Sequence, residues 1–572
     1  MSGPDRNVTR KEWRWAAVVG GLVVAASTLP YVVGYLAQTA ELRFSGALLD
    51  RVDYYSYLAR MWQGYRGAWS FQILFTPEAH EGVYFQPFHL ALGHLARLTG
   101  MEMPLVYQIV RVALAFLMLL TIYRFIAHFV VGVRTRRIAF LLIVTTSGLG
   151  WLTEVLARTP PTGVSPMDFW LLDGFTYLVV LTVPHFCAAI TLLLGIFLLL
   201  LRRPEGPSLR EGVLAVLASV LLGFIHPYML LLADLLPLLY WGVTALMARR
   251  KDRELESGLA DPLRYAPGGS DRPQHERWGR AFRRRVLTVA AMVTAQLPLL
   301  AYEVWVMRTQ PVFAAWSAQN LTLSPPPRIY LLGYGALLIL AVVGVRTWAR
   351  GKRPGLAFPL LWIGLVAVAA YVPWTLQRRF LEGVQIPLGL LAGVGLAQGL
   401  LPQPGGSVLG RTFVSRLRLL ALPLLVAMMS MSNLYLTAGF TVAAASRSQE
   451  IFWPADLLAG VDWLGENTSS EETVLADFET GNLIPARIGH RVVMGHEMET
   501  GAYESKKAEV ARFFDAATSD KERLELLERY GVSYVFYGPY EQALGAFDPA
   551  KASYLTLAAQ LPNVSVYRVN RP

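Results

Sequence analysis

Clusters of basic residues occur in every second gap between the long apolar runs of this chain. The clusters are Arg10/Lys11/Arg14, Arg134/Arg136/Arg137, Arg202/Arg203/Arg210, residues 249–285, Arg346/Arg350/Lys352/Arg353 and Arg411/Arg416/Arg418. A helix needs about 20 apolar residues to cross ~30 Å of hydrocarbon, and loops rich in Lys and Arg stay on the cytoplasmic side. The alternation therefore predicts a polytopic membrane protein whose N-terminus is cytoplasmic.

The apolar runs predict a mainly α-helical chain with about eleven membrane spans. Their approximate bounds are 15–36, 104–131, 138–156, 177–201, 212–226, 229–248, 286–307, 329–346, 356–374, 381–400 and 419–439. The stretch between Arg210 and Arg249 is too long for one crossing, because ~38 residues of helix extend ~57 Å. We therefore predict two spans there, joined by a tight turn at His226-Pro227. An odd number of spans places the C-terminus outside.

Composition supports many spans and not a single membrane anchor. Hydrophobic residues make up 54% of the chain and the mean hydropathy is +0.39. The net charge of +11 is a topology signal of the membrane part, so it does not indicate nucleic-acid binding. Cys187 is the only cysteine, which excludes an intrachain disulfide and a cysteine metal site. We interpret the first apolar segment as an uncleaved span, the alternative being a cleaved signal peptide.

The pattern typical of membrane helices ends near residue 439. Strand-like and helix-like segments then alternate, which predicts a small α/β domain. We predict a transmembrane domain over 1–440 and a soluble extracytoplasmic α/β domain over 441–572. The predicted strands are 473–476, 491–494, 533–537 and 564–569, and the predicted helices are 481–488, 506–517 and 521–530. The outer loop 37–103 is predicted to hold two short membrane-parallel helices, near 53–63 and 86–98.

Two acidic residues follow the first predicted span. Asp50 and Asp53 stand three residues apart at the start of a predicted helix, so both carboxylates can point to one side. There they could hold a divalent cation such as Mg²⁺ or Mn²⁺, or share a proton. The alternative is that both are ordinary helix-start residues favoured by the helix dipole.

A second acidic group, Asp168 and Asp173, precedes the fourth predicted span, which begins with Pro184-His185. Glu154 lies near the outer end of the third predicted span, where burying an unpaired charge is costly. We take Asp168 and Asp173 as candidates for substrate binding. We add His185 and His226 to these candidates. The alternatives are helix caps and headgroup contacts for the carboxylates, and structural hydrogen bonds for the histidines.

Arg378-Arg379 interrupts an apolar stretch on the predicted outer side, against the prevailing charge bias. Guanidinium groups bind phosphate oxygens in bidentate fashion, so a phosphate-bearing lipid headgroup is the predicted partner. Anchoring to bulk phospholipid is the alternative. Arg308 is a weaker candidate of the same kind. The sequence has no P-loop, nucleophile elbow or HExxH motif, so ATP-driven transport and serine-hydrolase chemistry are not favoured.

The segment Asp53-Tyr54-Tyr55-Ser56-Tyr57 resembles the Asp-Pro-Tyr-Tyr type of segment in oligosaccharyltransferase catalytic subunits. Together with the predicted architecture, it resembles the GT-C superfamily of membrane glycosyltransferases, which use polyprenyl-phosphate or polyprenyl-diphosphate sugars as donors. The resemblance covers most of the chain in architecture and only short stretches in motif. It implies an acidic first outer loop with membrane-parallel helices, a second acidic site before the fourth span and an outer C-terminal domain.

The resemblance also implies roles for the matched positions. Asp53 would be the catalytic base or a metal ligand, Asp50 would assist it, and Arg378 and Arg379 would hold the donor phosphate. The enzyme would transfer a hexosyl or pentosyl group to a lipid, glycan or protein acceptor, with inversion, at a bacterial or archaeal plasma membrane. Two departures matter: the Trp-Trp-Asp-Tyr-Gly motif of oligosaccharyltransferases is replaced by residues 477–481, and the acidic spacing is Asp-x-x-Asp. Transfer to an asparagine sequon is therefore not expected.

Two other functions fit the same residues. A lipid or glycan transporter would use the carboxylates to couple ions and the arginines to bind headgroups. A noncatalytic binding protein would keep the architecture and hold a lipid-linked sugar without turnover. A transporter is expected to place ionisable residues near the bilayer midplane, whereas most candidates here lie near its predicted outer surface.

Overall fold

A computed structural model describes residues 7–157, 166–256, 272–350, 354–401 and 424–570. The chain divides into two compact units. The first unit comprises Met1–Thr28, Arg111–Leu300 and Thr322–Thr437, and the second comprises Leu29–Val110, Ala301–Leu321 and Ala438–Pro572. Each unit is described by itself below.

Helices dominate the first unit, and four of them, α1, α4, α11 and α17, continue into residues of the second. These helices are α1 (Arg10–Leu36), α4 (Met103–Phe129), α5 (Val133–Thr145), α6 (Gly150–Ala157), α7 (Thr176–Thr182), α8 (Pro184–Leu201), α9 (Leu209–Ile225), α10 (Leu230–Glu256), α11 (Arg272–Thr309), α13 (Pro327–Arg350), α14 (Ala357–Ala369), α15 (Gln385–Val394) and α17 (Met431–Ala445). Short 3₁₀ turns η1 (Met167–Phe169), η2 (Leu172–Gly174), η3 (Pro227–Met229) and η6 (Gln377–Leu381) lie between them.

Seven helical segments in the described residues are long and apolar enough to cross a membrane. They are Arg10–Leu36, Met103–Phe129, Pro184–Leu201, Pro227–Met247, Gly279–Thr309, Pro327–Arg350 and Gln377–Leu400, with a shorter apolar helix at Ala357–Ala369. The predicted polytopic, mainly α-helical membrane fold is therefore confirmed. The count of about eleven stays a prediction, and its last span, 419–439, lies partly outside the described residues.

The predicted turn at His226-Pro227 is confirmed, because α9 ends at Ile225 and α10 begins after η3. The predicted third span, in contrast, is divided into α5 and α6. A buried side chain, Gln385 of α15, compensates for this break and for the start of α7. Its Nε2 donates to the Thr146 carbonyl oxygen over 2.8 Å, and its Oε1 accepts from the Thr176 amide over 2.7 Å. Broken helices are tolerated in a membrane only where such groups are satisfied.

The second unit contains α2 (Arg51–Tyr65) and α3 (Phe88–Thr99), which confirm the two short helices predicted in loop 37–103. Its other helices are α12 (Pro311–Gln319), α18 (Ala455–Asn467), α19 (Phe478–Ile488), α20 (Tyr503–Phe514), α21 (Asp520–Arg529) and α22 (Pro539–Leu544). A two-stranded antiparallel sheet pairs β1 (Leu42–Phe44) with β2 (Phe452–Pro454).

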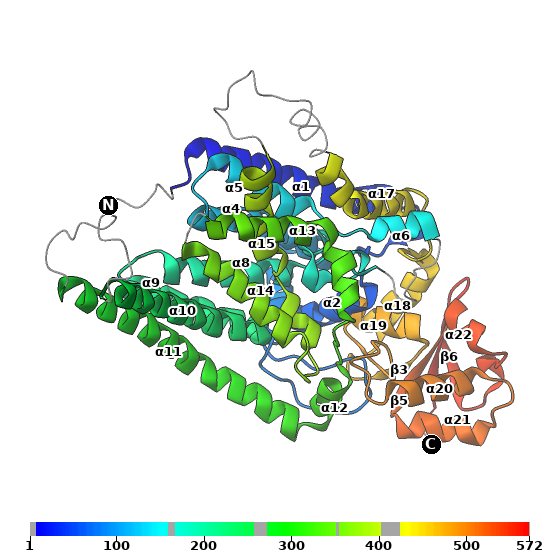
Figure 1. Ribbon diagram of the computed structural model, residues 1–572. Coiled ribbons are helices and arrows are strands. Elements are labelled where there is room, and N and C mark those ends of the chain that lie inside the picture. Colours follow the sequence, from blue (N-terminus) through cyan, green and yellow to red (C-terminus); the bar gives the residue numbers. More distant parts are fainter. Residues whose placement is uncertain (1–6, 158–165, 257–271, 351–353, 402–423, 571–572) are drawn as a thin grey trace. The chain divides into compact units, whose positions relative to one another are not determined.

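A five-stranded sheet has the order β4-β3-β5-β7-β6. Its strands are β3 (Thr473–Leu475), β4 (Arg491–Val492), β5 (Val532–Tyr537), β6 (Leu555–Gln560) and β7 (Ser565–Val569). β4, β3 and β5 run parallel, and β7 pairs antiparallel with both β5 and β6. Helices α20 to α22 lie beside the sheet (Figure 1). The predicted α/β character is confirmed. Strand β6 was not predicted, because Thr556 and Leu557 are exposed and its sequence lacks a regular apolar alternation.

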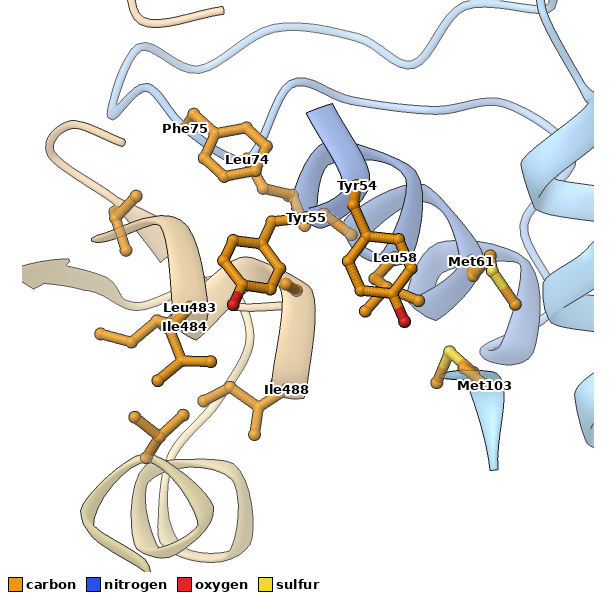
Figure 2. Close-up of a cluster of buried hydrophobic side chains, with 14 of the residues drawn as sticks. Tyr54, Tyr55, Leu58, Met61, Leu74, Phe75, Met103, Leu483, Ile484 and Ile488 are labelled. Carbon is orange, nitrogen blue, oxygen red and sulfur yellow. The ribbon is translucent and has the colours of Figure 1, made fainter. Parts of the chain in front are cut away.

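Helix α2 lies in the apolar core of the second unit. Figure 2 shows Tyr54, Tyr55 and Leu58 of α2 in one cluster with Leu74 and Phe75 and with Leu483, Ile484 and Ile488 of α19, while Met61 lies beside Met103. Helices α2 and α3 approach closely because glycines stand at their crossing. A Cβ at Gly93 would lie 1.9 Å from the Met61 carbonyl oxygen. The face of α2 that carries Asp53 is therefore held on a fixed support.

A similar glycine crossing joins α13 and α15 in the first unit. A Cβ at Gly344 would lie 1.9 Å from the Leu391 carbonyl oxygen, and one at Gly395 would lie 2.3 Å from that of Leu340. Small residues let membrane helices pack backbone to backbone, so this contact fixes their separation.

We predict that Gly344→Val destabilises the protein by about 1–3 kcal/mol, because the added methyl groups overpack the crossing. The measurement is thermal unfolding of the purified protein in detergent. Gly364→Val in α14 is the control, since a Cβ at Gly364 meets nothing within 4 Å. Equal unfolding temperatures for the two variants would contradict the role of the crossing.

Candidate functional site

The first candidate locus lies at the start of α2 in the second unit. Asp50, with φ 50°, is in the left-handed region that aspartate tolerates, and it is exposed immediately before the helix. Asp53 stands in the first turn, and its Oδ1 lies 2.9 Å from Nε2 of His496. The Asp53 side chain is 41% exposed, whereas that of His496 is 7% exposed. One carboxylate is thus held by a buried ring and still reaches solvent.

A backbone contact fixes the orientation of the His496 ring. The Met498 amide donates to Nδ1 over 3.1 Å, so in the neutral ring the hydrogen is on Nε2 and points at Asp53. Burial lowers the pKa of His496, but its hydrogen bond to Asp53 and the negative charge of Glu499 raise that pKa by more, so the net shift is upward. The Met498 contact needs the neutral ring, because a protonated Nδ1 cannot accept.

Two further residues of α2 bind the same loop. Ser56 Oγ donates to Glu499 Oε1 over 2.6 Å, and Arg60 Nη2 donates to that oxygen over 2.7 Å. Both ends of this ion pair are buried, and the Arg60 guanidinium lies 4.5 Å from the centre of the Phe71 ring. Asp53, Ser56 and Arg60 are three and four residues apart, so one face of α2 carries all three contacts.

We predict that Glu499→Ala destabilises the protein by about 3–5 kcal/mol, because Arg60 would keep an uncompensated buried charge. The measurement is the unfolding transition followed by tryptophan fluorescence in detergent. Glu525→Ala is the matched control, since its partner Lys521 is 86% exposed and the pair is 3.9 Å long; that change is expected to cost at most about 0.5 kcal/mol. Equal losses would show that the Arg60 pair does not anchor the loop.

The second candidate locus lies in the first unit, where Asp173 faces both predicted arginines. Asp173 Oδ1 lies 3.3 Å from Arg379 Nη1, and its Oδ2 lies 3.8 Å from Arg378 Nε. The aspartate side chain is 2% exposed, and those of Arg378 and Arg379 are 29% and 24% exposed. The guanidinium of Arg378 also lies 5.0 Å from the centre of the Trp170 ring. One buried carboxylate is therefore shared by two partly exposed cations.

Backbone bonds brace the turn that carries the arginines. The Arg378 amide donates to the Thr322 carbonyl oxygen over 2.9 Å, and the Thr322 amide donates to that of Thr375 over 2.8 Å. Gln377 Oε1 accepts from the Ser324 amide over 3.1 Å. Residues 322–324 thus hold η6 in place, and with it the backbone from which both arginine side chains extend.

A buried carboxylate, Glu382, lies one residue beyond η6. Its Oε2 lies 2.7 Å from His226 Nδ1 and accepts from the Tyr228 hydroxyl over 2.8 Å. The His185 ring lies 5.2 Å from that of His226. The predicted residues His185, His226, Asp173, Arg378 and Arg379 therefore belong to one region of the first unit.

Sequence reasoning missed Glu382 and Tyr228. A carboxylate inside the predicted span 381–400 was the available signal, since such a residue is costly in hydrocarbon and marks a functional position. Within the described residues, Glu382 Oε1 and Arg378 Nε are buried and have no hydrogen-bond partner.

Two other predicted residues lie apart from these groups. Asp168 is buried, and its Oδ2 accepts from the Gly150 amide over 3.2 Å at the start of α6, which gives it a structural partner. Arg308 is exposed in the last turn of α11, in the second unit. Asp50 and Asp53 supply two carboxylates, but no group of three or more potential ligands close enough to hold a metal ion occurs in the described residues. A divalent cation at Asp50 and Asp53 therefore stays a prediction.

The sequence matches no family model and no curated protein. Solved structures do match. The apo crystal structure of the oligosaccharyltransferase from Archaeoglobus fulgidus matches with 16% identity and a TM-score of 0.51, covering 92% of this chain and 69% of that chain. The cryo-EM structure of the mycobacterial arabinofuranosyltransferase AftD matches with 14% identity and a TM-score of 0.51, covering 99% of this chain and 40% of that chain. This chain has the GT-C fold.

A third match is ArnT from Cupriavidus metallidurans bound to undecaprenyl phosphate, with 14% identity, a TM-score of 0.45, and coverage of 96% of this chain and 98% of that one. The chain thus spans less than half of the AftD chain and nearly all of ArnT. The predicted resemblance to the GT-C superfamily is confirmed at the level of fold. In this GT-C fold the first acidic locus lies at the start of α2, as predicted, and its partner His496 comes from the loop that follows β4.

Proposed function

We propose that this GT-C protein is a membrane glycosyltransferase that moves a sugar from a polyprenyl-phosphate donor to an acceptor on the outer face of the membrane. The observation that carries the proposal is the Asp53 carboxylate, which is partly exposed at the start of α2 and oriented by a buried histidine. A general base must keep a defined direction and remain within reach of a substrate hydroxyl. Asp53 meets both requirements within a fold shared by an oligosaccharyltransferase and an arabinofuranosyltransferase.

In the proposed reaction Asp53 accepts the proton of the acceptor hydroxyl while that oxygen attacks the anomeric carbon of the donor. The new carbon–oxygen bond forms as the bond from the anomeric carbon to the phosphate oxygen breaks. The electron pair of the broken bond leaves with the polyprenyl phosphate. Attack opposite the leaving group inverts the anomeric carbon.

Arg378 and Arg379 are proposed to bind the donor phosphate. Both guanidinium groups lie beside the carboxylate of Asp173 and are partly exposed, so a ligand can reach them. The phosphate gains negative charge as it leaves, and preoriented cations stabilise that charge most in the transition state. Asp173 would hold the two arginines in place between turnovers, and the buried Arg378 Nε is a donor for a phosphate oxygen.

The substrate class follows from the same chemistry. A donor anchored by its lipid tail and held by its phosphate needs no nucleotide-binding domain, so a hexose or pentose on a polyprenyl phosphate fits. Residues 441–572 are proposed as an extracytoplasmic domain that contributes to acceptor recognition. The competing functions are a transporter and a noncatalytic binding protein.

We predict that cells lacking the gene lose one sugar-bearing product and accumulate a lipid-linked sugar. The measurement is mass spectrometry of glycans and lipid-linked sugars with and without the gene. Full-length Asp53→Asn is expected to leave the product absent, because the amide cannot accept the proton, while the precursor still accumulates. An unchanged set of sugar-bearing molecules would contradict the enzyme. Full complementation by Asp53→Asn would contradict the role of this base.

We predict that Arg378→Ala and Arg379→Ala each weaken binding of undecaprenyl phosphate by tenfold or more, because each removes charged hydrogen bonds worth about 1.5–3 kcal/mol. Binding is measured on the purified protein in detergent. Arg328→Ala is the matched control: it removes the same charge from an exposed position at the start of α13. Equal weakening in all three variants would indicate nonspecific attraction and contradict a phosphate site at η6.

A further inference from the structure

We propose that His496 is a positioning residue for catalysis, which directs the Asp53 carboxylate through the hydrogen bond from its Nε2. The proposal rests on the function assigned above to Asp53 and adds a requirement from a part of the chain 443 residues away. His496 would not touch the reacting atoms. It would act through Asp53.

The two ring nitrogens of His496 have different partners. Nδ1 accepts from the Met498 amide over 3.1 Å, and Nε2 faces Asp53 Oδ1 over 2.9 Å. The backbone contact selects the tautomer that carries its hydrogen on Nε2. The ring is thereby set as a donor to the carboxylate.

The loop that carries His496 is held on several sides within the second unit. The Thr500 amide donates to the His496 carbonyl oxygen over 2.8 Å, and Thr500 Oγ1 donates to the Phe75 carbonyl oxygen over 2.8 Å. Glu499 is bound by Ser56 and Arg60 of α2, the helix that carries Asp53. The histidine and the aspartate are therefore fixed to the same helix and cannot drift apart independently.

The burial of His496 suits a role in orienting the Asp53 carboxylate, in addition to a role in packing. Its side chain is 7% exposed, so water competes weakly for Nε2, while the Asp53 side chain is 41% exposed. A hydrogen bond to Oδ1 restricts rotation of the carboxylate about its Cβ–Cγ bond. A displacement of about 1 Å in such a group can lower turnover by about 100-fold.

Two amide substitutions separate the two ring nitrogens. In His496→Gln the side-chain nitrogen occupies nearly the place of Nε2, so the donor to Asp53 is kept and the acceptor for Met498 is lost. In His496→Asn the side-chain oxygen can replace Nδ1, so the Met498 contact is kept and the donor to Asp53 is lost. The pair therefore distinguishes orientation of the base from support of the loop.

The test is complementation of cells that lack the gene with full-length His496→Gln, His496→Asn and His496→Ala at equal protein levels. The readout is the initial rate at which the missing sugar-bearing product appears, with Asp53→Asn as the inactive reference. We expect the Gln variant to stay within a few-fold of the original protein, and the Asn and Ala variants to fall about 10- to 100-fold. Unfolding temperatures of the Gln and Asn variants in detergent are expected to agree.

Each other outcome has one meaning. If Asp53→Asn is inactive and His496→Asn is fully active, the positioning role is wrong and the proposed enzyme stands. If the Asn variant is active and the Gln variant is not, His496 supports the loop through Met498 and the proposal is wrong. If Asp53→Asn is itself active, the proposed base is wrong and the inference falls with it.

Discussion

Backbone amides and carbonyls in hydrocarbon have no water to bind, and this constraint shapes the first unit. Long helices satisfy these groups internally, so the breaks between helices need dedicated partners. Gln385 is such a partner, since one buried amide serves the end of α5 and the start of α7. Ser147 is another case, because its side chain donates to the Met429 carbonyl oxygen over 2.8 Å. The helices are thus interrupted where side chains such as Gln385 and Ser147 satisfy the backbone groups. The turn η6 with its two arginines is another irregular segment.

The second unit is stabilised by different contacts. Its α/β sheet and the helices around it have an ordinary apolar core, and α2 is inserted into that core by its tyrosines and leucine (Figure 2). The polar face of α2 carries Asp53, Ser56 and Arg60, whose side chains contact residues 496–499. Burial on one side and hydrogen bonds on the other leave α2 little freedom. The orientation of the Asp53 carboxylate on this helix is therefore fixed.

Much of this could be predicted from the sequence where the signal is local. Apolar length and basic clusters gave the membrane segments, and alternating apolar residues gave β3, β5 and β7. Asp53 was recognisable from its spacing at a helix start, and the arginine pair as charges in an apolar stretch. Asp173 was a candidate by itself, but its pairing with Arg379, 206 residues away, was not predicted, and His496, 443 residues from Asp53, was not a candidate. A histidine in a polar loop has no periodicity that distinguishes it, so only the tertiary fold brings it to α2.

The small sheet of β1 and β2 pairs Leu42–Phe44 with Phe452–Pro454, close to the two ends of the long membrane part of the chain. During synthesis, β1 leaves the ribosome about 400 residues before its partner exists. Phe44 and Tyr55 of the first loop therefore lack their aromatic neighbours Phe452 and Trp453 until the last quarter of the chain has been made.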